Sequence, residues 1–376
     1  MANTDIISVQ WQQDVLETTD GILPPGNDGG IGTDLKAWYG FSDLLQKSNT
    51  AASIYSTTIV STYSLVYKPS TAYTGGVLAP NGDIHFVPYG AANGQKISAN
   101  GSVSTYSLVY TTAGGYRGGV LAPNGDIHFV PATAAVGQKI DINGVISTYS
   151  LAYTTNSGDA YDGGVIAPNG DIHFIPCSAK VGQKISAAGI VSTYSLVYTT
   201  TIAYRGGVLA PNGDIYFSPF NALFGQKISA AGVVSTYTLG GSNYTGIVLA
   251  PNGDIHFIPY SASIGRKISV AGVISTYSLV YTTSVGAYAG GVLAPNGDIH
   301  FVPYSAKVGQ KISSSGVVST YSLVYTTSSA FFGGILTAAG DIYLIPYSAT
   351  VGQKISTTSA LPFGIGTLCS PWLNKL

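Results

Sequence analysis

The stretch that decides the fold is Leu-Ala-Pro-Asn-Gly-Asp-Ile-His-Phe-Val-Pro at residues 121–131, which recurs with small changes along the chain. Its Asn-Gly pair is typical of a tight hairpin turn, because such turns need positive φ at their central residues. Apolar and β-branched residues on both sides predict two short antiparallel strands joined at this turn. The aspartate of the turn recurs every 40 to 45 residues, at Asp83, Asp126, Asp171, Asp214, Asp254, Asp298 and Asp341.

Two further markers repeat with the same spacing. A Ser-Thr-Tyr motif begins at Ser61, Ser104, Ser147, Ser192, Ser235, Ser275 and Ser319. A Gln-Lys-Ile or Arg-Lys-Ile motif carries Lys96, Lys139, Lys184, Lys227, Lys267, Lys311 and Lys354. Seven copies of three markers indicate seven repeats of one structural unit.

Each unit is expected to hold four short strands, which in the first copy cover residues 76–79, 83–88, 95–98 and 103–110. The unit has no helical periodicity, and its length is that of a β-propeller blade. A strand-like segment, Ile59 to Tyr67, precedes the first unit, whereas the last unit ends after three strands. The sequence therefore predicts an all-β, seven-bladed propeller in which residues 59–67 complete the last blade as its outer strand. An open solenoid is the alternative.

Over residues 59–356 the units resemble the blades of WD40-like and kelch-like propellers, although the Trp-Asp dipeptide of WD40 blades is missing. They also resemble propeller repeats in proteins of bacteriophages and other large DNA viruses. This second resemblance implies a component of a virion or tail appendage. The expected organisation is a docking arm at residues 1–58, the propeller at 59–356 and a docking tail at 357–376.

Charge is sparse in this chain of 376 residues: 9% of the residues are charged and the net charge is −1. Such a balance disfavours nucleic acid as a partner. The start lacks a basic segment followed by an apolar one, so neither a signal peptide nor membrane insertion is expected. The expected location is a virion, or otherwise the cytoplasm or the medium. The state of the two cysteines, Cys177 and Cys369, stays open.

The five histidines occupy one position of the repeat, where Tyr216 and Tyr343 stand in the other two copies. Tyrosine replaces histidine as a hydrogen-bond donor but not as an equivalent metal ligand, so we expect a repeated hydrogen bond within each blade and no metal or cofactor. The repeated lysines and aspartates are expected to pair across a hairpin, with an anion-binding ring of lysines as the alternative.

The copies differ mainly in the connections between units and between the second and third strands of a unit. In a propeller these connections share one face, which is therefore the candidate recognition face. There an aromatic residue precedes each double glycine or its equivalent, and the residue after it varies. We expect a sugar or peptide site here, formed by Tyr73, Tyr116, Arg117, Tyr161, Asp162, Tyr204, Arg205, Tyr244 and Tyr288, unless the tyrosines pack between blades. The double glycines are expected to have a steric role near the channel.

These patterns favour a non-enzymatic structural and binding protein that docks into an assembly of other proteins through arms carrying Trp11, Trp38 and Trp372. The first alternative is a free-standing lectin that binds glycans. The second is a propeller glycosidase or lyase, for which Tyr161, Asp162, Arg117 and Arg205 form the plausible cluster. No catalytic residue is assigned, because no second irregular carboxylate is evident beside Asp162.

Overall fold

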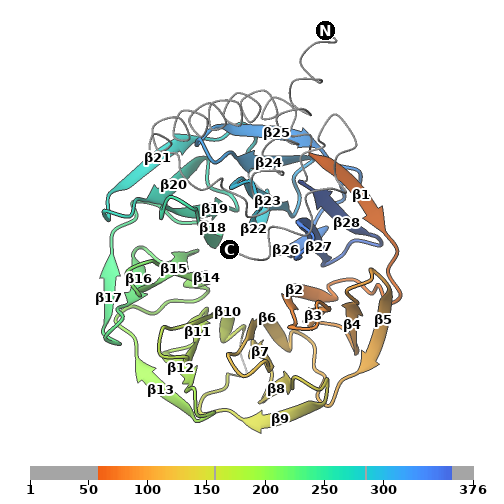
Figure 1. Ribbon diagram of the computed structural model, residues 1–376. Coiled ribbons are helices and arrows are strands. Elements are labelled where there is room, and N and C mark those ends of the chain that lie inside the picture. Colours follow the sequence, from red (N-terminus) through yellow and green to blue (C-terminus); the bar gives the residue numbers. More distant parts are fainter. Residues whose placement is uncertain (1–57, 156–157, 284–285, 358–376) are drawn as a thin grey trace, which may run out of the picture. The chain divides into compact units, whose positions relative to one another are not determined.

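The computed structural model describes residues 58–155, 158–283 and 286–357. Within these ranges the chain contains strands and no helix, and the strands form seven four-stranded antiparallel sheets arranged in a ring (Figure 1). The predicted all-β, seven-bladed propeller is therefore confirmed. The expected docking arm and tail, with Trp11, Trp38 and Trp372, lie outside the described residues, as does Cys369. No helix in the described ranges has the length and apolar character needed to cross a membrane.

We number the blades along the chain. Blade 1 contains β2 (Tyr73–Leu78), β3 (Ile84–Pro88), β4 (Asn93–Ile97) and β5 (Val103–Ser107). Blade 2 contains β6 (Tyr116–Leu121), β7 (Ile127–Pro131), β8 (Val136–Ile140) and β9 (Ile146–Ser150). Blade 3 contains β10 (Tyr161–Ile166), β11 (Ile172–Pro176), β12 (Val181–Ile185) and β13 (Val191–Ser195). Blade 4 contains β14 (Tyr204–Leu209), β15 (Ile215–Pro219), β16 (Gly225–Ile228) and β17 (Val234–Tyr237).

The remaining blades repeat this order. Blade 5 contains β18 (Tyr244–Leu249), β19 (Ile255–Pro259), β20 (Ile264–Ile268) and β21 (Ile274–Ser278). Blade 6 contains β22 (Tyr288–Leu293), β23 (Ile299–Pro303), β24 (Val308–Ile312) and β25 (Val318–Ser322). Blade 7 contains β26 (Phe331–Leu336), β27 (Asp341–Pro346), β28 (Gly352–Ser356) and β1 (Ile59–Tyr63), which pairs antiparallel with β28 from Ile59 opposite Ser356 to Tyr63 opposite Gly352.

The innermost strand of each blade starts earlier than the sequence pattern predicted. In blade 1 it begins at Tyr73 rather than Gly76. Tyr73 pairs with Pro88 of β3, and a register shift separates this pair from the regular pairing that starts at Gly76. The outermost strand ends at Ser107 rather than Tyr110. The same shift occurs at the start of the innermost strand in every blade. Such a bulge redirects the side chains near it.

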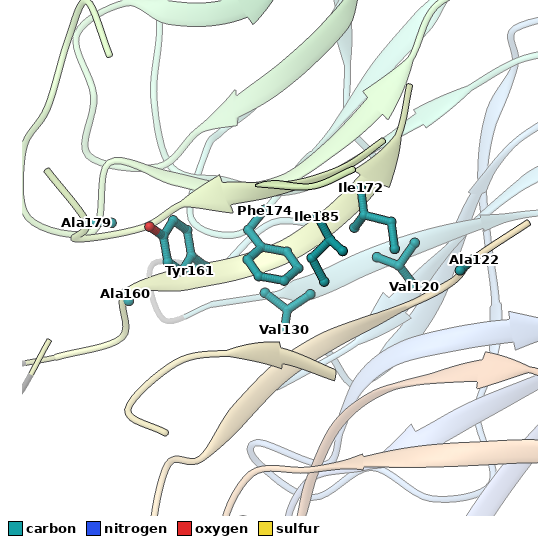
Figure 2. Packing of buried hydrophobic residues seen from close by; sticks show 9 residues of the cluster. All are labelled: Val120, Ala122, Val130, Ala160, Tyr161, Ile172, Phe174, Ala179 and Ile185. Atoms are coloured by element: carbon teal, nitrogen blue, oxygen red, sulfur yellow. The ribbon is translucent and has the colours of Figure 1, made fainter. Parts of the chain in front are cut away.

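The core lies between neighbouring blades rather than in one centre. Figure 2 shows one such cluster, in which the Phe174 ring of β11 packs beside Ile185 and faces Val130 of the preceding blade. Phe174 and Val130 are fully buried. Each interface around the ring has an equivalent cluster. Apolar burial of this kind joins each blade to the next.

A buried glutamine ties each blade to the connection that leaves the blade before it. Gln138 is fully buried, and its side-chain oxygen accepts hydrogen bonds from the backbone N–H groups of Val109 and Tyr110, at 3.1 and 2.8 Å. Blade 5 carries Arg266 at this position, whose Nη1 donates to the carbonyl oxygen of Leu239 at 2.9 Å. These bonds pair polar backbone groups of the connection with a side chain of the next blade.

Candidate functional site

Seven glycines narrow the centre of the propeller. Each has positive φ at the bulge of its innermost strand: Gly75, Gly118, Gly163, Gly206, Gly246, Gly290 and Gly333. A Cβ at Gly118 would lie only 2.8 Å from the Cα of Gly163, and a Cβ at Gly333 would lie 2.9 Å from the Cα of Gly75. The steric role expected for the double glycines is therefore confirmed, since both the backbone conformation and the close approach require glycine. We call this set the glycine ring.

A cavity of about 160 Å³ lies at the glycine ring. Besides the glycines, its walls are the residues that directly precede them, which include Thr74, Asp162, Arg205, Thr245 and Phe332. We call it the central cup. These residues start the innermost strands, so the cup opens toward the face where the blade-to-blade connections lie. That is the variable face singled out from the sequence.

Arginines and carboxylates from two blade connections meet beside the cup. Arg117 pairs with Asp159 through Nη1, and its Nε lies 3.2 Å from Oδ2 of Asp162. Arg205 approaches the same oxygen, with its Nε at 3.7 Å. In the described part of the chain, Asp162 Oδ2 and Nε of both arginines are buried without a hydrogen-bond partner. Both Nε atoms lie within ion-pair distance of this oxygen, and we call Arg117, Asp159, Asp162 and Arg205 the ion cluster.

Aromatic rings form an arc on the same face. Neighbouring ring centroids are 6.1 Å apart for Tyr89 and Tyr347, 6.0 Å for Tyr347 and Tyr304, 5.6 Å for Tyr304 and Tyr260, and 5.4 Å for Tyr260 and Phe220. These five residues, which we call the aromatic arc, each follow the proline that ends the second strand of a blade. Blades 2 and 3 have Ala132 and Cys177 at that position.

The arginines connect the ion cluster to aromatic rings. The Arg205 guanidinium carbon lies 4.1 Å from the Phe220 ring centroid. The Arg117 guanidinium lies 5.3 Å from the Tyr89 ring and 4.9 Å from the ring of Phe332. Stacking of this type holds a guanidinium in place while leaving its edge available for hydrogen bonds.

Burial and neighbouring charges shift the pKa values of three side chains at this site, Asp162, Arg117 and Cys177. Burial raises the pKa of Asp162 above its ordinary value, although Arg117 and Arg205 oppose the shift. For Arg117 burial acts in the opposite direction, but the carboxylates of Asp162 and Asp159 outweigh it and raise its pKa. Burial also raises the pKa of Cys177 to about 12, so this thiol stays protonated at neutral pH and is a poor nucleophile. A carboxylate with a raised pKa at the wall of a cup is typical of general acid–base sites.

The tyrosines expected to contact a ligand are placed elsewhere. Tyr73, Tyr116, Tyr161, Tyr204, Tyr244 and Tyr288 are at most 1% exposed. The hydroxyl of Tyr116, for example, donates to the carbonyl oxygen of Val136 in its own blade, and the other five make the equivalent bond. Burial removes these rings from the ligand site, so that part of the prediction is wrong and the alternative of packing in the core holds.

Three predicted residues, Arg117, Asp162 and Arg205, do come together, and two features were missed. The second carboxylate is Asp159, which lies in the connection before β10, one of the segments in which the copies differ. The aromatic arc was also missed, although it follows directly on the repeated Ile-His-Phe-Val-Pro motif. The sequence did contain a signal for it, because an aromatic residue follows the proline of this motif in five of the seven copies.

The repeated lysines and aspartates pair as the sequence indicated, whereas the expected histidine hydrogen bond forms in three of the five blades that carry a histidine. All seven lysine–aspartate pairs form within a blade, each with 2.7 Å between Nζ and Oδ2. In blades 1, 2 and 6 the histidine Nδ1 lies 3.2 to 3.3 Å from a tyrosine hydroxyl of the outermost strand. Within the described ranges no three His, Cys, Asp or Glu side chains cluster closely enough to hold a metal ion.

Comparisons with known proteins establish the fold. No protein-family model matches the chain, and no curated protein matches it. A streptogramin B lyase structure is similar with a TM-score of 0.70 at 19% identity, over 80% of this chain and 98% of that chain. Virginiamycin B lyase from Staphylococcus aureus gives a TM-score of 0.70 at 18% identity, over 80% and 100%. The extracellular domain of a hybrid two component system from B. thetaiotaomicron gives 0.59 at 9%, over 77% and 40%.

These similarities correct two expectations. The interpretation as a non-enzymatic component of a phage virion or tail is contradicted, because the two similar structures with a TM-score of 0.70 described above are lyases. The expectation that the chain is not an enzyme is contradicted by the same finding. No phage or viral protein is among the similar structures named here.

Proposed function

We propose that this chain is a lyase whose active site is the central cup. The observation that carries the proposal is Asp162, which lines the cup beside Arg117 and Arg205 and whose pKa is raised by burial. A raised pKa makes a carboxylate a stronger base. The similarity in fold to the streptogramin B and virginiamycin B lyases supports this reaction class over glycoside hydrolysis.

In the proposed step, Asp162 removes a proton from the carbon next to a substrate carbonyl. The electron pair of that C–H bond forms a carbon–carbon double bond, and the bond from the neighbouring carbon to an oxygen leaving group breaks. The leaving oxygen then takes up the proton from the Asp162 carboxyl group. No water is consumed, so one substrate gives products of the same total composition.

The other groups around the cup have matching roles. Charge that builds on the substrate carbonyl oxygen is stabilised by the Arg205 guanidinium, because Arg205 lines the cup beside Asp162. Arg117 holds Asp159 and Asp162 in position through its two contacts. The aromatic arc offers a rigid apolar surface for the remainder of the substrate.

The test uses two probes that carry an acidic C–H next to a carbonyl and an oxygen leaving group: the cyclic depsipeptide quinupristin and a polyuronide. The full chain is incubated with each, and the products are analysed by mass spectrometry. Elimination opens the depsipeptide ring without a change of mass, whereas hydrolysis adds one water. We expect elimination of at least one probe by the wild type and a loss of at least about 10²-fold in Asp162→Asn.

The matched control is Asp141→Asn. Asp141 lies in a turn between β8 and β9, on the face away from the cup, where its Oδ1 accepts backbone hydrogen bonds from Asn143 and Val145. This variant should retain activity. The proposal is wrong if the wild type converts neither probe, if the products contain added water, or if Asp162→Asn is as active as the wild type.

A further inference from the structure

Equivalent pockets lie between neighbouring blades on the face opposite the cup. Four of them have volumes of about 280, 270, 200 and 230 Å³, at the interfaces of blades 2 and 3, 3 and 4, 4 and 5, and 5 and 6. Each lies between the Pro-Asn-Gly-Asp turn of one blade and the turn between the last two strands of the next blade. We call these the turn-face pockets. They involve none of the residues of the ion cluster.

The pocket between blades 2 and 3 shows the chemistry of this site. One wall carries the ion pair of Lys139 and Asp126, with 2.7 Å between Nζ and Oδ2, together with His128. Burial lowers the pKa of His128 to about 4, so its imidazole is neutral at pH 7. Pro123 and Ile172 add apolar surface. The pocket therefore presents hydrogen-bonding groups and apolar groups together with no net charge.

Histidines also line two other turn-face pockets. His173 lines the pocket between blades 3 and 4, and His256 lines the pocket between blades 5 and 6. Their rings lie beside those of Tyr194 and Tyr277, with centroids 5.4 and 5.6 Å apart. Each imidazole therefore adds a polar group to the wall of its pocket, as His128 does between blades 2 and 3.

Size and charge narrow the class of ligand. The volumes lie below the roughly 300–1,000 Å³ of pockets for drug-sized molecules, so each pocket suits one ring-sized unit. An anion is disfavoured because each lysine is already neutralised by its aspartate. A pyranose ring combines hydroxyl donors and acceptors with an apolar C–H face. We propose that the turn-face pockets bind neutral sugar units of a glycan, one in each gap between blades.

One position of the repeat sets the size of the pocket. This position follows a serine in the turn between the last two strands of a blade. The two larger pockets, of about 280 and 270 Å³, have Ala187 and Ala230 there. The pocket of about 230 Å³ has Ser314, and the pocket of about 200 Å³ has Val270. A larger side chain thus accompanies a smaller pocket. Because blade 5 already carries valine, an alanine-to-valine change is compatible with this turn.

The test combines Ala187→Val and Ala230→Val in the full chain. Binding is measured on a glycan array and by ligand-observed NMR with methyl glycosides of glucose, galactose, mannose and N-acetylglucosamine. Several equivalent sites reinforce one another on a dense glycan surface, so we expect at least about a tenfold loss of apparent affinity when two sites are narrowed. The reverse change, Val270→Ala, should strengthen binding by opening the pocket between blades 4 and 5.

The matched control is Ala135→Val, the same change at an exposed residue on the opposite face. It should bind as the wild type does. Failure of the wild type to bind any glycan overturns the proposal, as does glycan binding that the double variant retains. Glycan binding that is lost in Arg205→Ala but retained in the double variant also overturns it, because the sugar would then occupy the cup. None of these outcomes depends on lyase activity.

Discussion

Mild acid should weaken this propeller through its five buried histidines. Burial lowers the pKa of His128 to about 4, against 6.5 for an unburied side chain, and His85, His173, His256 and His300 are shifted to about the same value. The folded state thus favours the neutral imidazole. Its stabilising contribution is complete above pH 6.5 and is lost as the pH falls through 4. At 1.36 kcal/mol per pKa unit, the full loss is about 3 kcal/mol for each histidine, of which about 2 kcal/mol is lost by pH 5.

Blade 4 supplies the perturbation that tests this reasoning. Tyr216 stands at the histidine position there, with its ring centroid 5.4 Å from that of Tyr237, and the rings of His128 and Tyr149 are also 5.4 Å apart. The hydroxyl of Tyr237 donates to the carbonyl oxygen of Phe217 instead of to a histidine. His128→Tyr should therefore fold while removing one buried group that titrates in acid.

The assay is urea unfolding of the wild type and of His128→Tyr at pH 7 and at pH 5. We expect the free energy of unfolding to fall by about 2 kcal/mol less in the variant between these two pH values. The ion pair of Asp126 and Lys139 is present in both proteins, so its titration cancels in the comparison. Tyr216→His should have the opposite effect. Equal losses in the wild type and His128→Tyr would refute the reasoning.

Four further variants test the contacts that hold the blades together. Gln138→Ala removes the acceptor of two part-buried backbone N–H groups and should cost about 1–3 kcal/mol in total, seen as a lower thermal midpoint. Arg266→Gln restores the consensus of the repeat and should be tolerated. Gly118→Ala should cost at least about 1–2 kcal/mol in urea unfolding, because of its positive φ and its contact with Gly163, and an unchanged midpoint would contradict this. Phe174→Ala should cost about 3–5 kcal/mol by the same assay, and a loss below 1 kcal/mol would show that the inter-blade cluster is not the core.

The fold could be predicted because its signals are local and repeated. An Asn-Gly turn between two apolar runs specifies a hairpin, and seven copies specify the number of blades. The double glycines could be interpreted for the same reason, since no residue with a Cβ fits the contact between Gly118 and Gly163. Strand ends were less certain, because the bulge before Gly76 changes the pairing register without leaving a distinct pattern.

The site could be predicted only in part. Arg117, Asp162 and Arg205 were found because they break the repeat at one position. Tyr116, which precedes Arg117, was assigned to the same surface, but the register shift between Tyr116 and Gly119 turns its ring into the core. Asp159 has no counterpart in the other copies, so no alignment of the repeats reveals where it lies. Long-range geometry, rather than composition, brings it to Arg117.

The function expected from the sequence was wrong because it depended on the two ends of the chain. Tryptophans at Trp11, Trp38 and Trp372 and a resemblance to viral repeats favoured docking in a virion. The described residues contain none of the three. The repeats themselves carry the carboxylates and arginines of the cup, and these irregular residues, rather than the regular ones, distinguish a candidate enzyme from a scaffold.

The glycines of the ring draw neighbouring innermost strands together at the centre of the propeller. The central cup and the turn-face pockets lie on opposite faces and share no lining residue. Substitutions in the loops of one side therefore leave the other side chemically untouched. Two unrelated activities can be installed, measured and altered independently on a single rigid disc of this kind.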